Sequence, residues 1–128
     1  MTFGLSSQSR AKMNGVHRDL VRVVERAIKI TEVDFRVIEG LRTLARQKEL
    51  VAAGASKTLN SRHLTGHAVD LVALVGGKVR WDWPLYSKIA AAMKAAALEL
   101  KIPITWGGDW KMRDGPHFEL QWAAYPKA

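Results

Sequence analysis

The sequence SRHLTGHAVD, residues 61–70, leads from a polar segment around Gly66 into the apolar run 68–74. An apolar run of this length next to turn residues predicts a buried strand, and the segment before it carries His63. Asp70 is the charged residue within the run. Because an unpaired carboxylate is unfavourable to bury, a metal ion bound by Asp70 would offset that penalty. A surface carboxylate on an edge strand is the alternative.

A second pairing of an acid with a histidine lies far downstream, in the segment Asp114-Gly115-Pro116-His117. Two histidines and one aspartate form the ligand set of a catalytic zinc site, which keeps a fourth position open for water and leaves another carboxylate to act as base. Either histidine alone would be interpreted as structural. Together, the two segments predict a hydrolase in which His63, Asp70 and His117 bind Zn²⁺.

Residues 61–70 also fit the pattern Ser-x-His-x-x-Gly-x-Ala-x-Asp, with every fixed position filled. This pattern resembles the signature of a zinc-dependent family of cell-wall enzymes, the D-Ala-D-Ala carboxypeptidases and L-alanyl-D-glutamate endopeptidases. Asp114 and His117 resemble the acid-x-x-His element of that family, which implies that Asp114 is the general base. The resemblance extends over about residues 35–120 and is closest to the phage endolysin branch.

A third segment, EGLRTLARQ at residues 39–47, resembles the part of the family that carries an arginine in contact with the substrate carbonyl. That arginine would be Arg42. The resemblance implies that Arg42 stabilises the developing oxyanion while Asp114 takes a proton and returns it to the departing amine. It also implies the Hedgehog/DD-peptidase type of fold, within a single catalytic domain over residues 1–128.

Composition and charge limit the possible partners. The 128 residues suffice for one folded domain, and the absence of cysteine means that any metal must be bound by His, Asp or Glu. A net charge of +8 favours anionic partners such as the bacterial cell wall, and a solvated surface that serves solubility is the alternative. No recognised nucleic-acid-binding motif is present, so we expect no nucleic-acid partner.

The periodicity of apolar residues predicts a mixed fold. Helices are expected over residues 17–29, 43–53 and 84–100, and strands over residues 34–39, 68–74, 104–106 and 117–120. Residues 60–66 should form a loop, and Gly54 should cap the second helix. Because helices and strands do not alternate regularly, the sequence predicts an α+β fold: a small, largely antiparallel sheet with flanking helices.

Four further residues are candidates for substrate binding. Ser61 would hydrogen-bond the substrate or position the loop. Trp106 and Trp110 would line a groove, although tryptophans of small domains more often lie in the core. Asp109 belongs to the same region and is the alternative general base.

Three other polar residues near the motifs have simpler interpretations. Glu119 would share a strand face with His117, so it either orients a metal ligand or packs beside a basic side chain. His67 occupies a position that the family pattern leaves open. His17 precedes a helix, where a capping or surface role is sufficient.

These features predict a zinc-dependent peptidoglycan hydrolase that cuts the stem peptide between L-Ala and D-Glu. A D-alanyl-D-alanine carboxypeptidase would use the same motifs, and a basic nucleic-acid-binding module is the remote alternative. Residues 1–9 lack the pattern of a secretory signal, and no apolar run reaches the ~20 residues of a membrane span. We therefore expect a monomer without stable membrane association, made in the host cytoplasm and acting on the wall after release by a separate partner.

Overall fold

A computed structural model describes residues 2–56 and 58–126 of the chain. Helices and strands are mixed along these residues, as predicted. In chain order the elements are α1 (Ser7–Lys12), α2 (Arg18–Ile30), β1 (Asp34–Glu39), α3 (Leu44–Ala52), the 3₁₀ turn η1 (Arg62–Thr65), β2 (Ala68–Val75), β3 (Lys78–Arg80), α4 (Trp83–Leu100), β4 (Ile104–Trp106), the 3₁₀ turn η2 (Gly107–Asp109) and β5 (His117–Leu120).

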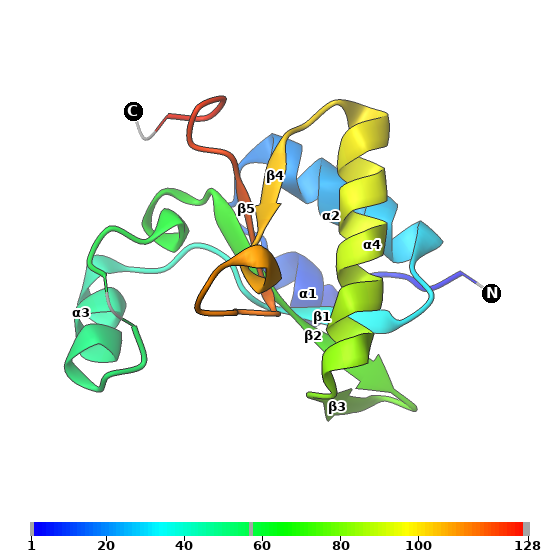
Figure 1. Cartoon of the computed structure of the whole chain (residues 1–128), viewed down its shortest axis with the longest axis horizontal. Coiled ribbons are helices and arrows are strands. Elements are labelled where there is room, and N and C mark those ends of the chain that lie inside the picture. Colours follow the sequence, from blue (N-terminus) through cyan, green and yellow to red (C-terminus); the bar gives the residue numbers. More distant parts are fainter. Residues whose placement is uncertain (1, 57, 127–128) are drawn as a thin grey trace.

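The strands form one antiparallel sheet, in the order β1-β2-β5-β4, and β3 pairs with the end of β2 (Figure 1). This arrangement confirms the predicted α+β class with an antiparallel sheet. It also shows that β2 is an interior strand, paired at Asp70 with Glu39 of β1 on one side and with His117 of β5 on the other. The alternative that Asp70 is a surface carboxylate on an edge strand is therefore wrong.

The hydrophobic core lies between the sheet and the two long helices. α2 and α4 lie together in Figure 1, well apart from α3. The predicted apolar positions of α4 are buried at Ile89, Met93 and Ala96. Leu71 of β2 and Phe118 of β5 are fully buried against the same core. Because alternate strand residues face opposite ways, the core side chains leave their neighbours Asp70 and His117 on the other face of the sheet.

Capping residues explain where the helices begin. His17 precedes α2, and its Nδ1 accepts a hydrogen bond from the backbone N–H of Asp19, which confirms the capping role. Thr43 caps α3 in the same way. α4 has a proline in its first turn, where no backbone donor is needed, and ends at Lys101, which has a left-handed φ of 59°. No helix among the described residues is long and apolar enough to cross a membrane.

Two short elements and both 3₁₀ turns were not predicted. α1 and β3 are mostly polar and exposed, so they show no apolar pattern. The expected loop over residues 60–66 contains η1, whose first turn is capped by Ser61: its Oγ accepts a hydrogen bond from the backbone N–H of His63 at 3.2 Å. This turn gives His63 a defined position directly before β2.

Gly66 ends η1 and turns the chain into β2. Its φ is 73°, in the left-handed region, and a Cβ atom there would lie 2.3 Å from the carbonyl oxygen of Gly15. Gly54 has a similar φ of 76°, but a Cβ atom there would meet nothing within 4 Å. The two glycines therefore separate the effect of backbone conformation from that of steric overlap.

We predict that Gly66→Ala destabilises the fold much more than Gly54→Ala. The Gly54 variant should lose about 1–2 kcal/mol, the penalty of a left-handed alanine. The Gly66 variant should lose more than about 3 kcal/mol, because backbone atoms must also shift. Urea denaturation of both variants measures the difference. Equal losses would contradict the role given to the contact with Gly15.

Candidate metal centre

The register of three strands places acidic and histidine side chains in one row. Glu39 on β1 lies opposite Asp70 on β2, and Asp70 lies opposite His117 on β5. Residues directly opposite in an antiparallel pair project from the same face, so these three side chains are neighbours. η1 brings His63 to the same face, where its ring is 5.1 Å from that of His117. The sheet thus brings His117 beside His63 and Asp70, which lie far from it in the sequence.

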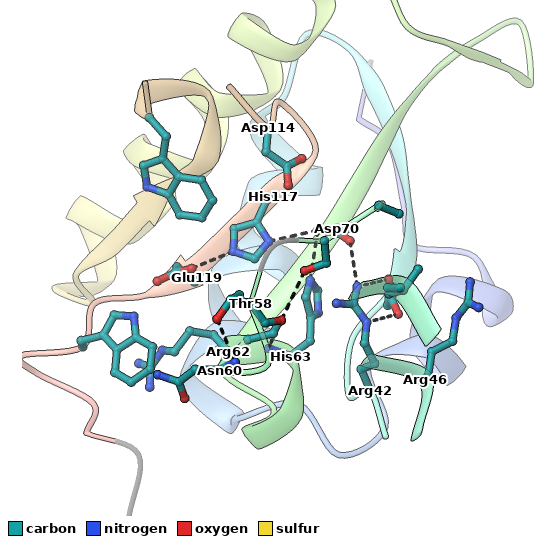
Figure 2. A pocket seen from close by; sticks show the side chains of 17 residues that line it. Arg42, Arg46, Thr58, Asn60, Arg62, His63, Asp70, Asp114, His117 and Glu119 are labelled. Atoms are coloured by element: carbon teal, nitrogen blue, oxygen red, sulfur yellow. Dashed lines mark hydrogen bonds and ion pairs between the residues drawn. The ribbon is translucent and has the colours of Figure 1, made fainter. Parts of the chain in front are cut away.

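The two histidines point different ring nitrogens at Asp70 (Figure 2). Nε2 of His63 and Nδ1 of His117 each lie 3.2 Å from Oδ1 of Asp70. The other nitrogen of His63, Nδ1, is 2.8 Å from the carbonyl oxygen of Gly40. A carbonyl oxygen only accepts, so Nδ1 carries a proton whether the ring is neutral or charged, and Nε2 is the nitrogen that faces Asp70. Ligand atoms of His63, Asp70 and His117 lie within 4.8 Å of one another.

The charges of this cluster stabilise one another strongly. Burial would raise the pKa of the Asp70 carboxyl, but hydrogen bonds from His117 and His63 outweigh it and hold the pKa well below its usual range. Burial would likewise lower the pKa of His117. Its hydrogen bonds to Asp70 and Glu119 outweigh that effect and raise the pKa to about 9. In the absence of metal, the cluster therefore holds a proton that a cation would replace.

The cluster lies in a pocket of about 450 Å³. Eight of the residues singled out in the sequence line it: Arg42, Ser61, His63, Asp70, Trp110, Asp114, His117 and Glu119. Substrate-sized ligands are bound by pockets of this kind, in which a few polar groups converge. The structure thus brings together both motifs and the arginine segment.

Arg42 is held beside Asp70 by a network of acceptors. Its Nε and Nη2 donate to the carboxylate of Glu39, and its Nη1 donates to Oε1 of Gln47 at 2.6 Å. Nη2 lies 3.9 Å from Oδ2 of Asp70. The backbone N–H of Arg42 also donates to the carbonyl of His63 at 2.9 Å, which ties the arginine segment to the metal loop. A guanidinium has five N–H groups, so these three side-chain bonds leave two for a ligand.

Asp114 occupies the same pocket on the loop before β5. Burial and the negative charge of Asp70 raise the pKa of the Asp114 carboxyl. The positive charges of His117, His63 and Arg42 act against this rise. A carboxylate with a raised pKa in a pocket is a candidate general base, since it holds a proton more readily than an ordinary aspartate.

Two of the substrate-binding candidates lie elsewhere. Trp106 is 7% exposed, stacks between Trp83 and Phe118, and donates from Nε1 to the carbonyl of Gly115 at 2.7 Å. Among the described residues, the pocket lining includes neither Trp106 nor Asp109. The expectation that Trp106 lines the groove is wrong, because its strand turns the ring into the core.

Asp109 is similarly turned away from the pocket. Its carboxylate is exposed and pairs with Lys94 of α4 at 2.8 Å. Trp110, the next residue, does line the pocket, with its ring 5.0 Å from that of His117. The contrast arises at the end of η2, where the chain direction changes between the two residues. The geometry thus favours Asp114 over Asp109 as the base.

Sequence reasoning missed several pocket residues. Glu39, Arg62 and Trp122 line the pocket, and Gln47 binds Arg42 without lining it. Glu39, Gln47 and Arg62 lie within the quoted segments, but the resemblance gives none of them a role. Gln47 is fully buried, accepts from Arg42 and donates to Ser56 and to the carbonyl of Thr58. A glutamine on a helix is normally read as solvent-facing. For Glu39, the spacing of three residues from Arg42 was the feature of the sequence that could have indicated their ion pair.

Three clustered ligand-type side chains in an open pocket, beside a carboxylate and an arginine, are typical of metal-dependent hydrolases. Residues 1–125 match the family described as phage L-alanyl-D-glutamate peptidase. The chain belongs to this family of peptidases, in agreement with the resemblance carried by residues 61–70 and 114–117.

Individual relatives agree with this assignment. The chain is 30% identical over 129 residues to the L-alanyl-D-glutamate peptidase of Escherichia phage T5, covering 98% of this chain and 94% of that protein. It is also 30% identical over 129 residues to the L-alanyl-D-glutamate peptidase of Listeria phage A118, a match that covers 98% of this chain and spans 45% of the length of that protein.

Two solved structures are similar to this chain. The L-Ala D-Glu endopeptidase ChiX of Serratia marcescens matches with a TM-score of 0.93 and 51% identity, over 97% of this chain and 94% of that chain. The vancomycin resistance D,D-dipeptidase VanXYg matches with a TM-score of 0.53 and 20% identity, over 82% of this chain and 50% of that one. At that identity the second match shows a shared fold, which confirms the predicted DD-peptidase type.

We predict that the metal-free chain loses stability as the pH rises through about 9. His117 has a pKa raised from 6.5 to about 9, so its contribution is full below pH 6.5 and is lost as the pH rises through 9. The loss should reach up to about 3 kcal/mol. Urea denaturation in the presence of a chelator measures it. His117→Asn should remove this dependence, and a wild-type stability that is constant or rising over the same interval would contradict it.

Proposed function

We propose that this peptidase is a zinc-dependent peptidoglycan hydrolase that cleaves the L-alanyl-D-glutamate bond of the stem peptide. The observation that carries the proposal is the convergence of His63, Asp70, His117, Asp114 and Arg42 in one pocket. The 51% identity to the Serratia L-Ala D-Glu endopeptidase supports the choice of bond.

The donor set fits Zn²⁺. Two imidazole nitrogens and one carboxylate oxygen lie within 4.8 Å of one another, and a three-residue set leaves a position for a further ligand. When bound, zinc polarises a peptide carbonyl and makes water a better nucleophile near neutral pH. His63, Asp70 and His117 would hold the ion, while the hydrogen bond that His63 Nδ1 donates to the Gly40 carbonyl keeps the His63 ring in the orientation that binding requires.

Asp114 and Arg42 would act on the reacting groups. The Asp114 carboxylate would accept a proton from the attacking water and deliver it to the departing amine, a task suited to its raised pKa. Arg42 would donate its remaining N–H groups to the carbonyl oxygen of the scissile bond as negative charge develops there. Glu39 and Gln47 hold the guanidinium in place for this role.

The rest of the pocket would bind the stem peptide. Trp110 offers an aromatic face next to His117. Ser61 lines the pocket and accepts a hydrogen bond from the His63 backbone, which supports a role in positioning the metal loop. The net charge of +8 would attract the chain to the anionic wall, where we propose that it acts as a monomer after release from the cytoplasm of the host.

We predict that Asp114→Asn keeps the fold and the metal but lowers turnover about 10²–10⁴-fold, because an amide cannot accept the proton of water. Hydrolysis of purified peptidoglycan and elemental analysis of the variant measure the two properties. Asp109→Asn is the matched control, since Asp109 is exposed and pairs with Lys94. Near wild-type hydrolysis by the Asp114 variant, with loss of activity in the Asp109 variant, would exchange the two roles.

We further predict that digestion of peptidoglycan exposes new amino termini on glutamate and lowers the turbidity of cell walls. An internal cut separates the cross-linked peptide from its glycan, whereas removal of a terminal D-Ala leaves cross-links in place. Labelling of the new amino termini, followed by mass spectrometry, identifies the bond. Release of free D-Ala without new glutamate termini would instead indicate a D-alanyl-D-alanine carboxypeptidase.

A further inference from the structure

Glu119 is a buried carboxylate that the proposed reaction does not use. It follows His117 by two residues on β5, so both side chains project from the same face of the strand. The Glu119 side chain is 8% exposed, and its Oε1 lies 2.7 Å from Nε2 of His117. Its neighbours across the sheet are Ala68 and Thr105, neither of which is charged. A carboxylate in such surroundings needs a compensating positive group.

Arg62 supplies a positive charge beneath this carboxylate. Arg62 is 2% exposed, and its Nη2 donates to the carbonyls of Leu120 and Tyr125 at 2.9 and 2.7 Å. Its Nε and Nη1 are buried without a hydrogen-bond partner among the described residues. The charges of Arg62 and Glu119 attract each other. The bond to Leu120, the residue after Glu119, holds the guanidinium beside that part of β5.

The hydrogen bond from His117 to Glu119 determines which ring nitrogen faces the cluster. A carboxylate only accepts, so Nε2 keeps its proton whether the ring is charged or neutral. Nδ1 is then the nitrogen that gives up its proton, and it is the one 3.2 Å from Asp70. A neutral histidine without such a partner holds its proton on either nitrogen. Glu119 thus does for His117 what the carbonyl of Gly40 does for His63.

We propose that Glu119 is a positioning residue, which keeps Nδ1 of His117 directed at the metal centre by accepting the proton of Nε2. The inference rests on the proposed zinc site and adds the group that prepares one of its ligands. Carboxylates in this position also make the imidazole a stronger ligand, and their removal typically weakens metal binding 10–100-fold.

The first test measures the affinity of the full chain for Zn²⁺, by competition with a chromophoric chelator. Glu119→Leu and Glu119→Ala should weaken binding about 10–100-fold. Glu119→Gln should weaken it less, because its amide oxygen still accepts from Nε2. The matched control is Glu99→Leu, which removes an exposed carboxylate of α4 that pairs with Arg26 and should leave the affinity unchanged. Circular dichroism checks that each variant is folded.

The second test needs no metal. Long-range ¹H–¹⁵N correlation spectra of the histidine rings, recorded above the pKa of about 9, report the tautomer of neutral His117. The wild type should carry the proton on Nε2, and a folded Glu119→Leu or Glu119→Ala variant should show a mixture. A wild-type proton on Nδ1, or a Zn²⁺ affinity within twofold of wild type in these variants, would overturn the inference. A wild type with the Nε2 proton but no affinity for Zn²⁺ would instead overturn the proposed zinc site.

Discussion

The pairing of Asp70 with two histidines is the interaction on which the rest of the site depends. Asp70 sits on the central strand, and its Oδ1 lies 3.2 Å from one nitrogen of each histidine. A buried carboxylate is destabilising unless such partners are present. The stability of the fold and the metal-binding site therefore both require the two histidines to lie next to Asp70. The antiparallel register meets that demand by placing His117 opposite Asp70, while η1 delivers His63 from the loop.

Around this centre, the side chains of His63, His117 and Arg42 each donate a hydrogen bond to an acceptor that holds them in place. Gly40 accepts from His63, Glu119 from His117, and Glu39 from Arg42. Acceptors that cannot donate leave one orientation for the group they bind, which reduces the reorganisation needed when a ligand arrives. The backbone bond from Arg42 to the His63 carbonyl joins two of these units. The functional side chains of the pocket are thus held by partners within the chain itself.

Local sequence determined much of this architecture. The helical or alternating spacing of apolar residues predicted the longer helices and strands, because such spacing places the apolar side chains on one face that can be buried. β5 and β4 were predicted with the bounds that the structure shows, residues 117–120 and 104–106. The paired motifs identified His63, Asp70 and His117 as a set, since two histidines and an aspartate in motif spacing have few structural uses. α1 and β3 escaped prediction because their residues are mostly polar and exposed, so neither element carries an apolar pattern.

Tertiary structure decided which polar residues share the pocket. Strand register placed Glu39 beside Asp70, although the two are far apart in sequence, and the packing of α3 buried Gln47 against Arg42. At the end of η2, the side chain of Trp110 lies in the pocket, whereas that of Asp109 pairs with Lys94. Trp106 became part of the core because β4 faces its ring toward Phe118. Sequence pattern specifies which face of an element is apolar, but side chains from different elements meet only through register and packing, which depend on contacts distant along the chain.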